Sequence, residues 1–438
     1  MSIALTTVLL FVVFGILLFA GVPISVSIIV SSIVTALSSL SWDQVTFITM
    51  QKMNSGVESF SLLAVPLFIL AGNIMNNGGI AKRLVNFAQL FVGRIPGNLA
   101  QANILGNMLF GALSGSSVAA ASAIGGCINP IEKEQDYDPA FSAAANIVSA
   151  PTGLLIPPTS AFIVYSTVAG GVSISTLFMA GYVPGILMGL VCMVIAFVMA
   201  KKLGIKATGR DKSVSIAKTV WSAIPSLLLI IIVIGGIVSG IFTATEGAGV
   251  AVLYCLVLSI IYKSITFKSF LKILENSAKT SGIILFLIAA SSAMSFVMAY
   301  SGVPAAISNA LLGISTNKVV IFILMNLILM VIGMFMDITP AILIFTPIFL
   351  PIARSFGMTD IQFGVMLIFN MCLGNVTPPV GSVLFVGCGI GKVSIEKVTP
   401  KLIPYFIALI VLLMLVTFVP ALSLACLLYT SPSPRDCS

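Results

Sequence analysis

The feature that most constrains this chain is a pair of adjacent prolines that occurs twice inside apolar sequence. Pro157-Pro158 interrupts an apolar segment of the first half, and Pro378-Pro379 interrupts one of the second half, 221 positions later. Before each pair lies another interrupted stretch, and the same offset aligns Ser116 with Asp337. Proline ends helical hydrogen bonding, and lipid cannot satisfy the freed backbone groups, so these breaks must face a cavity, an ion or a ligand.

Composition places most of the chain in a membrane. The 438 residues are 59% hydrophobic and 8% charged, whereas a soluble domain carries about 25% charged residues. Apolar runs such as 6–24 and 402–419 are long enough for a bilayer core of about 30 Å. Backbone in lipid must satisfy its own hydrogen bonds, so we predict an all-α integral membrane protein.

Several kinds of chemistry are disfavoured by the residues present. The chain contains no histidine, which removes the commonest metal ligand and proton relay. Its seven cysteines form no Cys-x-x-Cys pair and lie mostly in apolar segments, where they are expected to pack as small core residues. Zinc and redox functions are therefore not supported.

Four interrupted segments define the predicted architecture. Residues 98–128 and 319–352 have small, polar or proline residues near their middle, and we predict that both form re-entrant helical hairpins. Residues 140–170 and 362–390 contain the proline pairs and are predicted to be broken membrane helices. Interrupted segments at corresponding places in two halves are typical of secondary transporters that bind their solute near the membrane midplane.

The basic residues predict the orientation. If the N-terminus is outside and neither hairpin crosses the membrane, 17 of the 21 Lys and Arg residues fall on the same side of the membrane. An excess of basic residues marks the cytoplasmic side. The first hairpin then enters from the cytoplasm and the second from outside, so the halves are inverted copies. The stretches 82–94 and 267–279 are predicted to lie as basic amphipathic helices along the cytoplasmic surface. Because the charges are scattered over short loops, orientation explains the net charge of +8 better than nucleic-acid binding does.

Two of the thirteen acidic residues are predicted to lie inside apolar segments. Asp337 falls at the tip of the second hairpin, and an acid in a membrane segment is a functional hypothesis because its charge is costly there. A structural N-cap is the alternative for Asp337, and the two roles are compatible. Glu246 lies near the outer end of its segment, where an interfacial cap is the favoured interpretation.

The breaks also offer many oxygen atoms. Freed carbonyl groups together with Ser and Thr hydroxyls form the kind of site that a hard cation prefers, and helix N-termini beyond the breaks suit a carboxylate. One hairpin and one broken helix in each half predict at least two Na⁺ sites with the solute between them. The predicted Na⁺ residues are Ser114, Gly115, Ser117, Gly153 and Pro157 in the first half, and Asp337, Thr339, Gly374, Thr377 and Pro378 in the second.

At these residues the chain resembles the large membrane subunit of TRAP (tripartite ATP-independent periplasmic) transporters. The motifs are 154–160 (LLIPPTS), 242–246 (FTATE), 337–340 (DITP) and 375–379 (NVTPP), and residues 161–171 (AFIVYSTVAGG) resemble the sialic-acid branch. The resemblance covers the chain to about residue 425.

The resemblance implies Na⁺-driven uptake by an elevator mechanism of the ion-transporter superfamily type. It implies a substrate site at Ser116, Asp337, Thr159 and Ser160. It also implies a separate small four-helix membrane subunit, a periplasmic substrate-binding protein and a place in the bacterial inner membrane. Sialic acid is the first choice of solute, and C4-dicarboxylates or other sugar acids remain open.

The expected organisation follows from these assignments. We predict scaffold helices at 1–60, transport-domain halves at 61–170 and 281–390, linking scaffold helices at 171–280, a last membrane helix at 391–426 and a non-native or disordered tail at 427–438. A channel and an intramembrane enzyme are the rival functions. No filter motif supports the first, and the lack of histidine, paired membrane acids and a nucleophile elbow speaks against the second.

Overall fold

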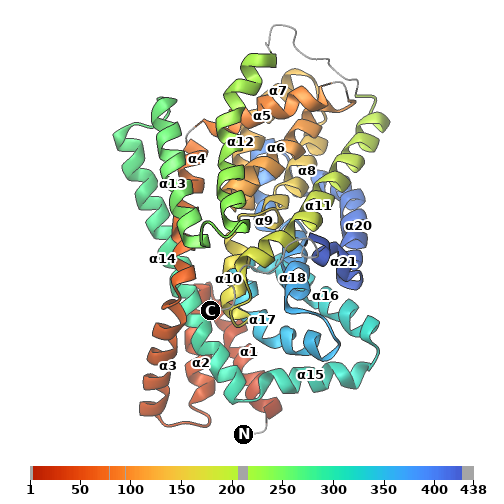
Figure 1. The fold of residues 1–438 in the computed structure, drawn as a ribbon. Coiled ribbons are helices and arrows are strands. Elements are labelled where there is room, and N and C mark those ends of the chain that lie inside the picture. Colours follow the sequence, from red (N-terminus) through yellow and green to blue (C-terminus); the bar gives the residue numbers. More distant parts are fainter. Residues whose placement is uncertain (1–2, 78, 94, 206–215, 427–438) are drawn as a thin grey trace.

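Figure 1 shows the computed structural model, which describes residues 3–77, 79–93, 95–205 and 216–426. Within these ranges the chain forms helices joined by short connections, and no strand occurs. The predicted tail at 427–438 and part of the basic cluster between residues 201 and 218 lie outside the described residues. The all-helical class predicted from composition is confirmed for the part of the chain that is described.

The first half of the chain carries eleven α-helices and one short 3₁₀ helix. They are α1 (Ile3–Phe19), α2 (Ile24–Ala36), α3 (Trp42–Val57), η1 (Phe60–Leu63), α4 (Ala64–Asn77), α5 (Ile80–Val92), α6 (Asn98–Ser114), α7 (Ser117–Glu134), α8 (Pro139–Ser149), α9 (Thr152–Leu155), α10 (Ser160–Val168) and α11 (Ile174–Lys202).

The second half repeats this order with fewer interruptions. Its helices are α12 (Ile216–Val238), α13 (Ala244–Ile261), α14 (Phe267–Tyr300), α15 (Val303–Ile314), α16 (Lys318–Phe335), α17 (Ile338–Ser355), α18 (Asp360–Gly374), α19 (Ser382–Gly391), α20 (Ile395–Phe418) and α21 (Pro420–Leu424). The starts of α7 and α17, of α8 and α18, and of α11 and α20 are each 221 positions apart. The repeat inferred from the proline pairs therefore extends over most of both halves.

Corresponding helices of the two halves lie toward opposite ends of the molecule, so each half contributes to both ends. Figure 1 shows α5, α7 and the start of α12 near the top, and α1, α3 and α15 near the bottom, with α14 running along the left edge. The short helix α5, which follows α4, corresponds to α15, which follows α14, and each begins after a glycine with positive φ, Gly79 at 69° and Gly302 at 70°. This arrangement is the one expected for repeats of opposite orientation.

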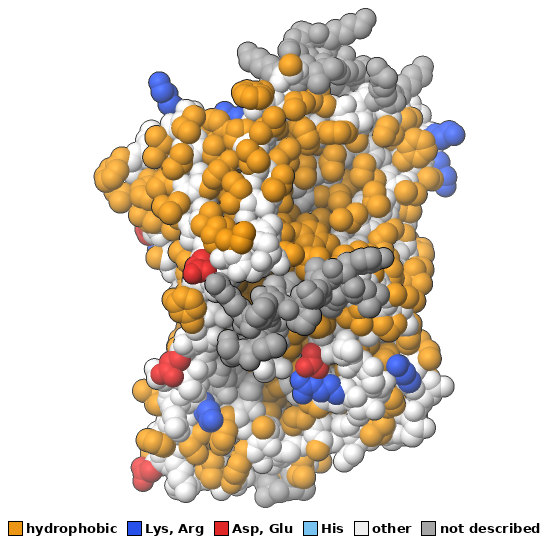
Figure 2. Space-filling model, in the orientation of Figure 1, with side chains coloured by type: hydrophobic (Ala, Val, Ile, Leu, Met, Phe, Trp, Pro, Cys, Tyr) orange, Lys and Arg blue, Asp and Glu red, His pale blue; other side chains and the backbone are white. Residues whose placement is uncertain are grey.

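Eight of the described helices are long and apolar enough to cross a membrane, or up to nine if the bent pair α8–α9 and α10 counts as one span. The break in that pair bends the chain by 50°. Figure 2 shows a broad hydrophobic surface over the upper half, with Lys and Arg side chains at its upper edge and in the lower part of the molecule. Such a surface suits lipid contact, since hydrocarbon requires an apolar exterior.

One predicted surface helix is corrected. Residues 267–279 do not form a separate amphipathic helix, because they are the first part of α14, a continuous helix of 34 residues. The stretch 82–94 does contain a helix of its own, α5, which ends at Val92. The difference arises because α14 packs along α2, α3 and α4, so tertiary contacts support its whole length.

Candidate functional site

Both proline pairs lie in breaks between helices, as predicted. Pro157-Pro158 separates α9 from α10, and Pro378-Pro379 separates α18 from α19; both X–Pro bonds are cis. The two hairpins are also present: α6 packs on α7, α16 packs on α17, and each pair is joined by a two-residue tip. The helices extend beyond the predicted hairpin bounds, to Glu134 in the first and Ser355 in the second.

The two hairpin tips line one cavity. This cavity has a volume of about 410 Å³ and is bordered by Ser114–Ser117 from the first tip and by Asp337–Thr339 from the second. Ser160, at the start of α10, lies on the same cavity. Sequence positions more than 200 residues apart are thus brought together, including Ser116 and Asp337, which the repeat had aligned.

The first tip is built by a helix end and a helix start that meet in two residues. Gly115 ends α6 in a left-handed conformation with φ of 60°, which suits glycine because it has no side chain to clash. The Ser116 hydroxyl accepts a hydrogen bond from the Ala119 N–H at 3.3 Å and so caps α7. Ser114 and Ser117 are largely buried on either side. The tip therefore presents backbone and hydroxyl groups without any charge.

The second tip holds the cavity's carboxylate. Asp337 occupies the N-cap position of α17, but its side chain makes no capping hydrogen bond. Its Oδ1 instead accepts a hydrogen bond from the Asn375 side chain at 3.2 Å. Contrary to the expectation of a buried acid, Asp337 is exposed, because it borders the cavity. The Asp337 side chain therefore does not cap α17, and its carboxylate is available to a ligand.

The first broken helix touches the first tip. A Cβ added to Gly115 would lie 3.7 Å from both the Pro158 carbonyl oxygen and the Ser160 amide nitrogen, so the tip packs on the break in the backbone. The Thr159 hydroxyl accepts a hydrogen bond from Phe162 N–H, and Thr159 is fully buried. Of the two predicted substrate residues after the prolines, Ser160 lines the cavity and Thr159 caps α10.

Several predicted cation residues lie beside the cavity and not on its lining. Gly153 belongs to α9 and Pro157 to the break, while Gly374 ends α18. The Thr377 hydroxyl donates to the Leu373 carbonyl at 2.6 Å, which leaves its lone pairs for other donors or a cation. Pro378 follows it in the second break, and Asn375 connects this break to Asp337.

Each half contains one backbone contact between two glycines. A Cβ on Gly153 would lie 2.1 Å from the Cα of Gly111, and a Cβ on Gly374 would lie 2.5 Å from the Cα of Gly333. Real Cβ atoms essentially never approach another heavy atom within 3.0 Å. Each pair therefore presses the first arm of a hairpin directly against the broken helix of the same half, and small residues are the usual means of such close approach.

Buried amides reinforce the same two contacts. Asn107 Nδ2 donates to Asn146 Oδ1 at 3.0 Å and to Ser149 Oγ at 2.9 Å, joining α6 to α8. In the second half Asn370 Nδ2 donates to Asn326 Oδ1 at 2.9 Å, joining α18 to α16. Sequence reasoning missed these residues, because single asparagines in apolar helices do not reveal their partners.

Other cavity residues were also missed. Asn73 and Asn76 of α4 and Thr280 of α14 face the tips from across the cavity. Asn73 donates to the Ser277 hydroxyl at 2.8 Å, which joins α4 to α14. The sequence signal that could have identified Asn73 and Asn76 is their position as polar residues in the last turns of an apolar segment. None of the described residues that line the cavity is Lys or Arg.

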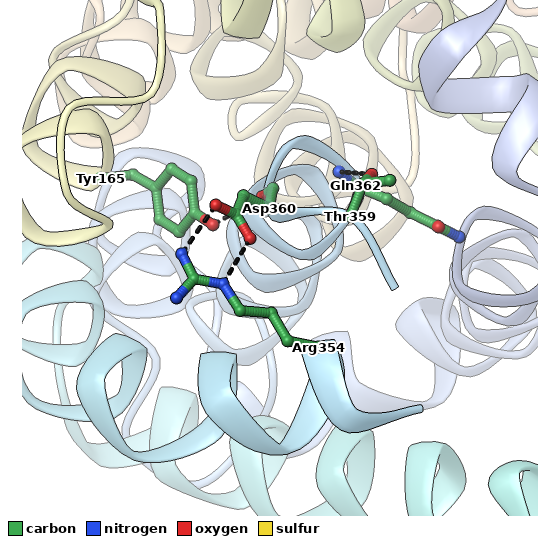
Figure 3. A network of polar contacts seen from close by, with 5 residues as sticks. All are labelled: Tyr165, Arg354, Thr359, Asp360 and Gln362. Atoms are coloured by element: carbon green, nitrogen blue, oxygen red, sulfur yellow. Dashed lines mark hydrogen bonds and ion pairs between the residues drawn. The ribbon is translucent and has the colours of Figure 1, made fainter. Parts of the chain in front are cut away.

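A polar network attaches the second hairpin to the first broken helix (Figure 3). Arg354, at the end of α17, makes two bonds of 2.7 Å to the Asp360 carboxylate, and the Tyr165 hydroxyl donates to the Asp360 carbonyl at 2.6 Å. The Thr359 hydroxyl accepts from the Gln362 N–H at 3.2 Å and caps α18. The partly exposed ion pair adds little stability, but the network joins α10, α17 and α18, and so links the two halves.

The two acids predicted to lie inside apolar segments are exposed, and a different acid is buried. Glu246 forms a capping box with Thr243: its carboxylate accepts from the Thr243 N–H at 2.7 Å, as the cap interpretation expected. Glu132, which is not one of the two acids predicted to lie inside apolar segments, is only 2% exposed. The reason is that α7 continues to Glu134 and packs against α8 and α19.

Two repeated helical halves, whose hairpin tips line one polar cavity together with residues of the first broken helix, define a membrane protein of the transporter class. The family model described as "Tripartite ATP-independent periplasmic transporter, DctM component" matches residues 11–422. The chain belongs to this family, whose members are transporters and not enzymes.

Curated relatives cover nearly the whole chain. The uncharacterized protein YgiK of Salmonella typhimurium is 49% identical over 95% of this chain and 96% of its own length. The 2,3-diketo-L-gulonate TRAP transporter large permease protein YiaN of Escherichia coli is 37% identical over 85% and 88%. The sialic acid TRAP transporter large permease protein SiaM of Vibrio cholerae is 34% identical over 93% and 95%. These identities do not single out the sialic-acid branch.

A solved structure shares the fold. The YdaH transporter of Alcanivorax borkumensis superposes with a TM-score of 0.65 at 13% identity, covering 89% of this chain and 90% of that one. At this identity the likeness concerns the fold alone.

Proposed function

We propose that the chain is the transport subunit of a Na⁺-coupled system that takes up an acidic sugar by an elevator movement. The observation that carries the proposal is the single cavity lined by both hairpin tips, with Asp337 exposed in it. Sialic acid is the first candidate solute, and C4-dicarboxylates or other sugar acids are the alternatives. The hairpins and broken helices would form the moving domain.

Sodium coupling rests on the donor set. No group of three or more His, Cys, Asp or Glu residues in the described chain could hold a transition metal, whereas hydroxyl and carbonyl oxygens suit a hard cation. Asp337 has a carboxylate in the cavity with only an amide as its partner, so a cation there would fit. The residues that would hold Na⁺ are Ser114, Gly115, Ser117, Gly153 and Pro157 near the first tip, and Asp337, Thr339, Gly374, Thr377 and Pro378 near the second.

The cavity's charge supports an ordered process. The cavity is lined by the Asp337 carboxylate, and none of its described lining residues is Lys or Arg. An anionic solute would therefore be repelled by Asp337. Bound Na⁺ removes that repulsion, and the N-terminus of α7 beyond the first tip favours an anion. Solute binding at Ser116, Ser160 and Asp337, with Thr159 behind them, would therefore require Na⁺ first.

The uncharged groups of the lining favour a polyhydroxylated acid. Amides of Asn73 and Asn76 and hydroxyls of Ser122, Ser160 and Thr280 surround the tips. Such groups can exchange hydrogen bonds with sugar hydroxyls in both directions, since amides and hydroxyls both donate and accept. A dicarboxylate would instead bring a second charge into a cavity whose described lining has no cationic side chain.

Two partners complete the proposed system. The matched family is tripartite by description, and we expect a separate small four-helix membrane subunit and a periplasmic binding protein that delivers the solute. The chain would lie in the bacterial inner membrane with its N-terminus in the periplasm. The cavity is lined by Asn76 and Thr280, which are close in sequence to the basic residues of α5 and α14, and this supports an opening toward the proposed cytoplasmic side.

Reconstitution tests the proposal. The chain would be placed in proteoliposomes with its small subunit, and uptake of a panel of labelled acids measured with the binding protein. We expect uptake of a sugar acid that falls to background when either the Na⁺ gradient or the binding protein is omitted. Flux that persists without both would identify a channel, and preferred uptake of a dicarboxylate would reject the sugar-acid assignment.

A further inference from the structure

Glu132 is a buried acid that the proposed transport cycle does not use. It lies in the last turn of α7 and is 2% exposed. In the described chain its Oε1 atom has no hydrogen-bond partner. The hydroxyl of Ser142, on α8, is also buried and lies beside the Glu132 carboxyl group, to which it can donate a hydrogen bond. One enclosed space thus holds a carboxyl group and a single serine hydroxyl.

The enclosure lies at the base of the first hairpin, away from its tip. The Tyr137 hydroxyl donates to Asn98 Oδ1 at 3.1 Å, which connects the chain after α7 to the start of α6. On another face Asn129 Nδ2 donates to the Ile390 carbonyl at 2.8 Å, which connects α7 to α19. These bonds hold the α7 end in place and keep Glu132 covered.

Among the described residues, no charged group neutralises this carboxyl. The helices packed on α7 are α5, α6, α8, α9 and α19. Their titratable and charged groups, with those of α7 itself and the adjoining segments, are Lys82, Arg83, Cys127, Lys133, Glu134, Asp136, Tyr137, Asp138, Cys388 and Lys392. Asp138 is paired with Lys401 at 3.0 Å. None of these groups shifts the pKa of Glu132, which burial raises and the Ser142 hydroxyl lowers by a smaller amount.

An ionised carboxylate without a counterion is costly in such a place, whereas a protonated one is a tolerable polar group. The protonated carboxyl still bonds to Ser142, because its O–H can donate to the serine hydroxyl, which both donates and accepts. We therefore propose that Glu132 is a proton-binding site of the first hairpin, occupied when α7 is packed on α8 and released when the base of the hairpin opens.

The pH window follows from burial. Helix α7 is not among the candidate spans, and burial raises the pKa of Glu132 from its ordinary value of 4.5 to about 7. Between these values the folded protein holds the proton and the unfolded chain does not. The contribution of Glu132 to stability is therefore complete below pH 4.5 and is lost as the pH rises through 7.

Infrared difference spectroscopy and thermal unfolding of the purified full chain test this site together. We expect a protonated carboxylic-acid band at pH 6 that is absent from Glu132→Gln and disappears with a midpoint near pH 7. Glu132→Gln should unfold several degrees above the wild type at pH 8.5, and that difference should shrink as the pH falls and vanish below pH 4.5. Glu134→Gln, at an exposed position two residues away, should change neither measurement.

Two results would overturn the proposal. One is a wild-type spectrum without the protonated band at pH 6, a measurement that does not depend on how well any variant folds. The other is a difference in unfolding temperature that follows the NaCl concentration and ignores pH, which would make the ligand of Glu132 and Ser142 a metal cation. Neither measurement involves solute transport, so both are independent of the proposed function.

Discussion

Replacing Asp337 by alanine is expected to abolish Na⁺-driven uptake in proteoliposomes while leaving the protein folded. The carboxylate is exposed in the cavity and makes no bond to its own helix, so its loss removes little structure. A hydrogen bond to a charged group is worth about 1.5–3 kcal/mol, and Na⁺ affinity should therefore fall roughly ten- to hundredfold or more. The measurement is initial uptake as a function of Na⁺ concentration.

The matched control for this change is Asp43→Ala. Asp43 is an exposed acid in the first turn of α3, remote from the tips in sequence and not part of the cavity lining. It should retain wild-type uptake and Na⁺ dependence. Asp337→Ala should also keep the wild-type elution profile and unfolding temperature. If Asp337→Ala transported like the wild type, Asp337 would have no part in coupling.

Adding a single methyl group at Gly153 or Gly374 should strongly impair both folding and transport. In each case the new Cβ would fall inside the contact distance of a backbone atom, 2.1 Å from Gly111 Cα or 2.5 Å from Gly333 Cα, and backbone cannot swing aside as a side chain can. Overpacking of this kind costs about 1–3 kcal/mol and sometimes more. We expect a lower unfolding temperature and at least a severalfold loss of uptake.

Gly282→Ala separates this steric effect from the general effect of losing a glycine. Gly282 lies inside α14, and no atom lies within 4 Å of the position that its Cβ would take. Alanine there should be neutral or stabilising by about 0.5–1 kcal/mol, because glycine is unfavourable within a helix. Equal unfolding temperatures for Gly153→Ala and Gly282→Ala would contradict the close backbone contact as a requirement of the fold.

Much of the architecture could be predicted because proline acts locally. Pro157-Pro158 and Pro378-Pro379 cannot continue a helix whatever surrounds them, so the two breaks were predictable from the residues alone. Their common offset then aligned Ser116 with Asp337, and both are found at the tips that line one cavity. The Glu246 cap was equally local, since its partner Thr243 is three residues away.

Other features depend on which helices meet. The expectation that Asp337 is buried and Glu132 exposed was wrong in both respects, since burial depends on neighbours distant in sequence. Asn73 and Thr280 share the cavity with the tips only because α4 packs on α14. The glycine contact of Gly111 with Gly153 likewise joins two helices that are ordinary when considered separately.

By itself the sequence determined that this protein is helical, lies in a membrane, repeats its design in two halves and breaks its helices at four matching places. Those properties follow from composition and from the covalent geometry of proline, which act whatever the rest of the chain does. The tertiary structure alone decided which carboxyl groups meet solvent, which glycines touch and which amides face the tips. Packing joins residues hundreds of positions apart, and no local pattern carries that information.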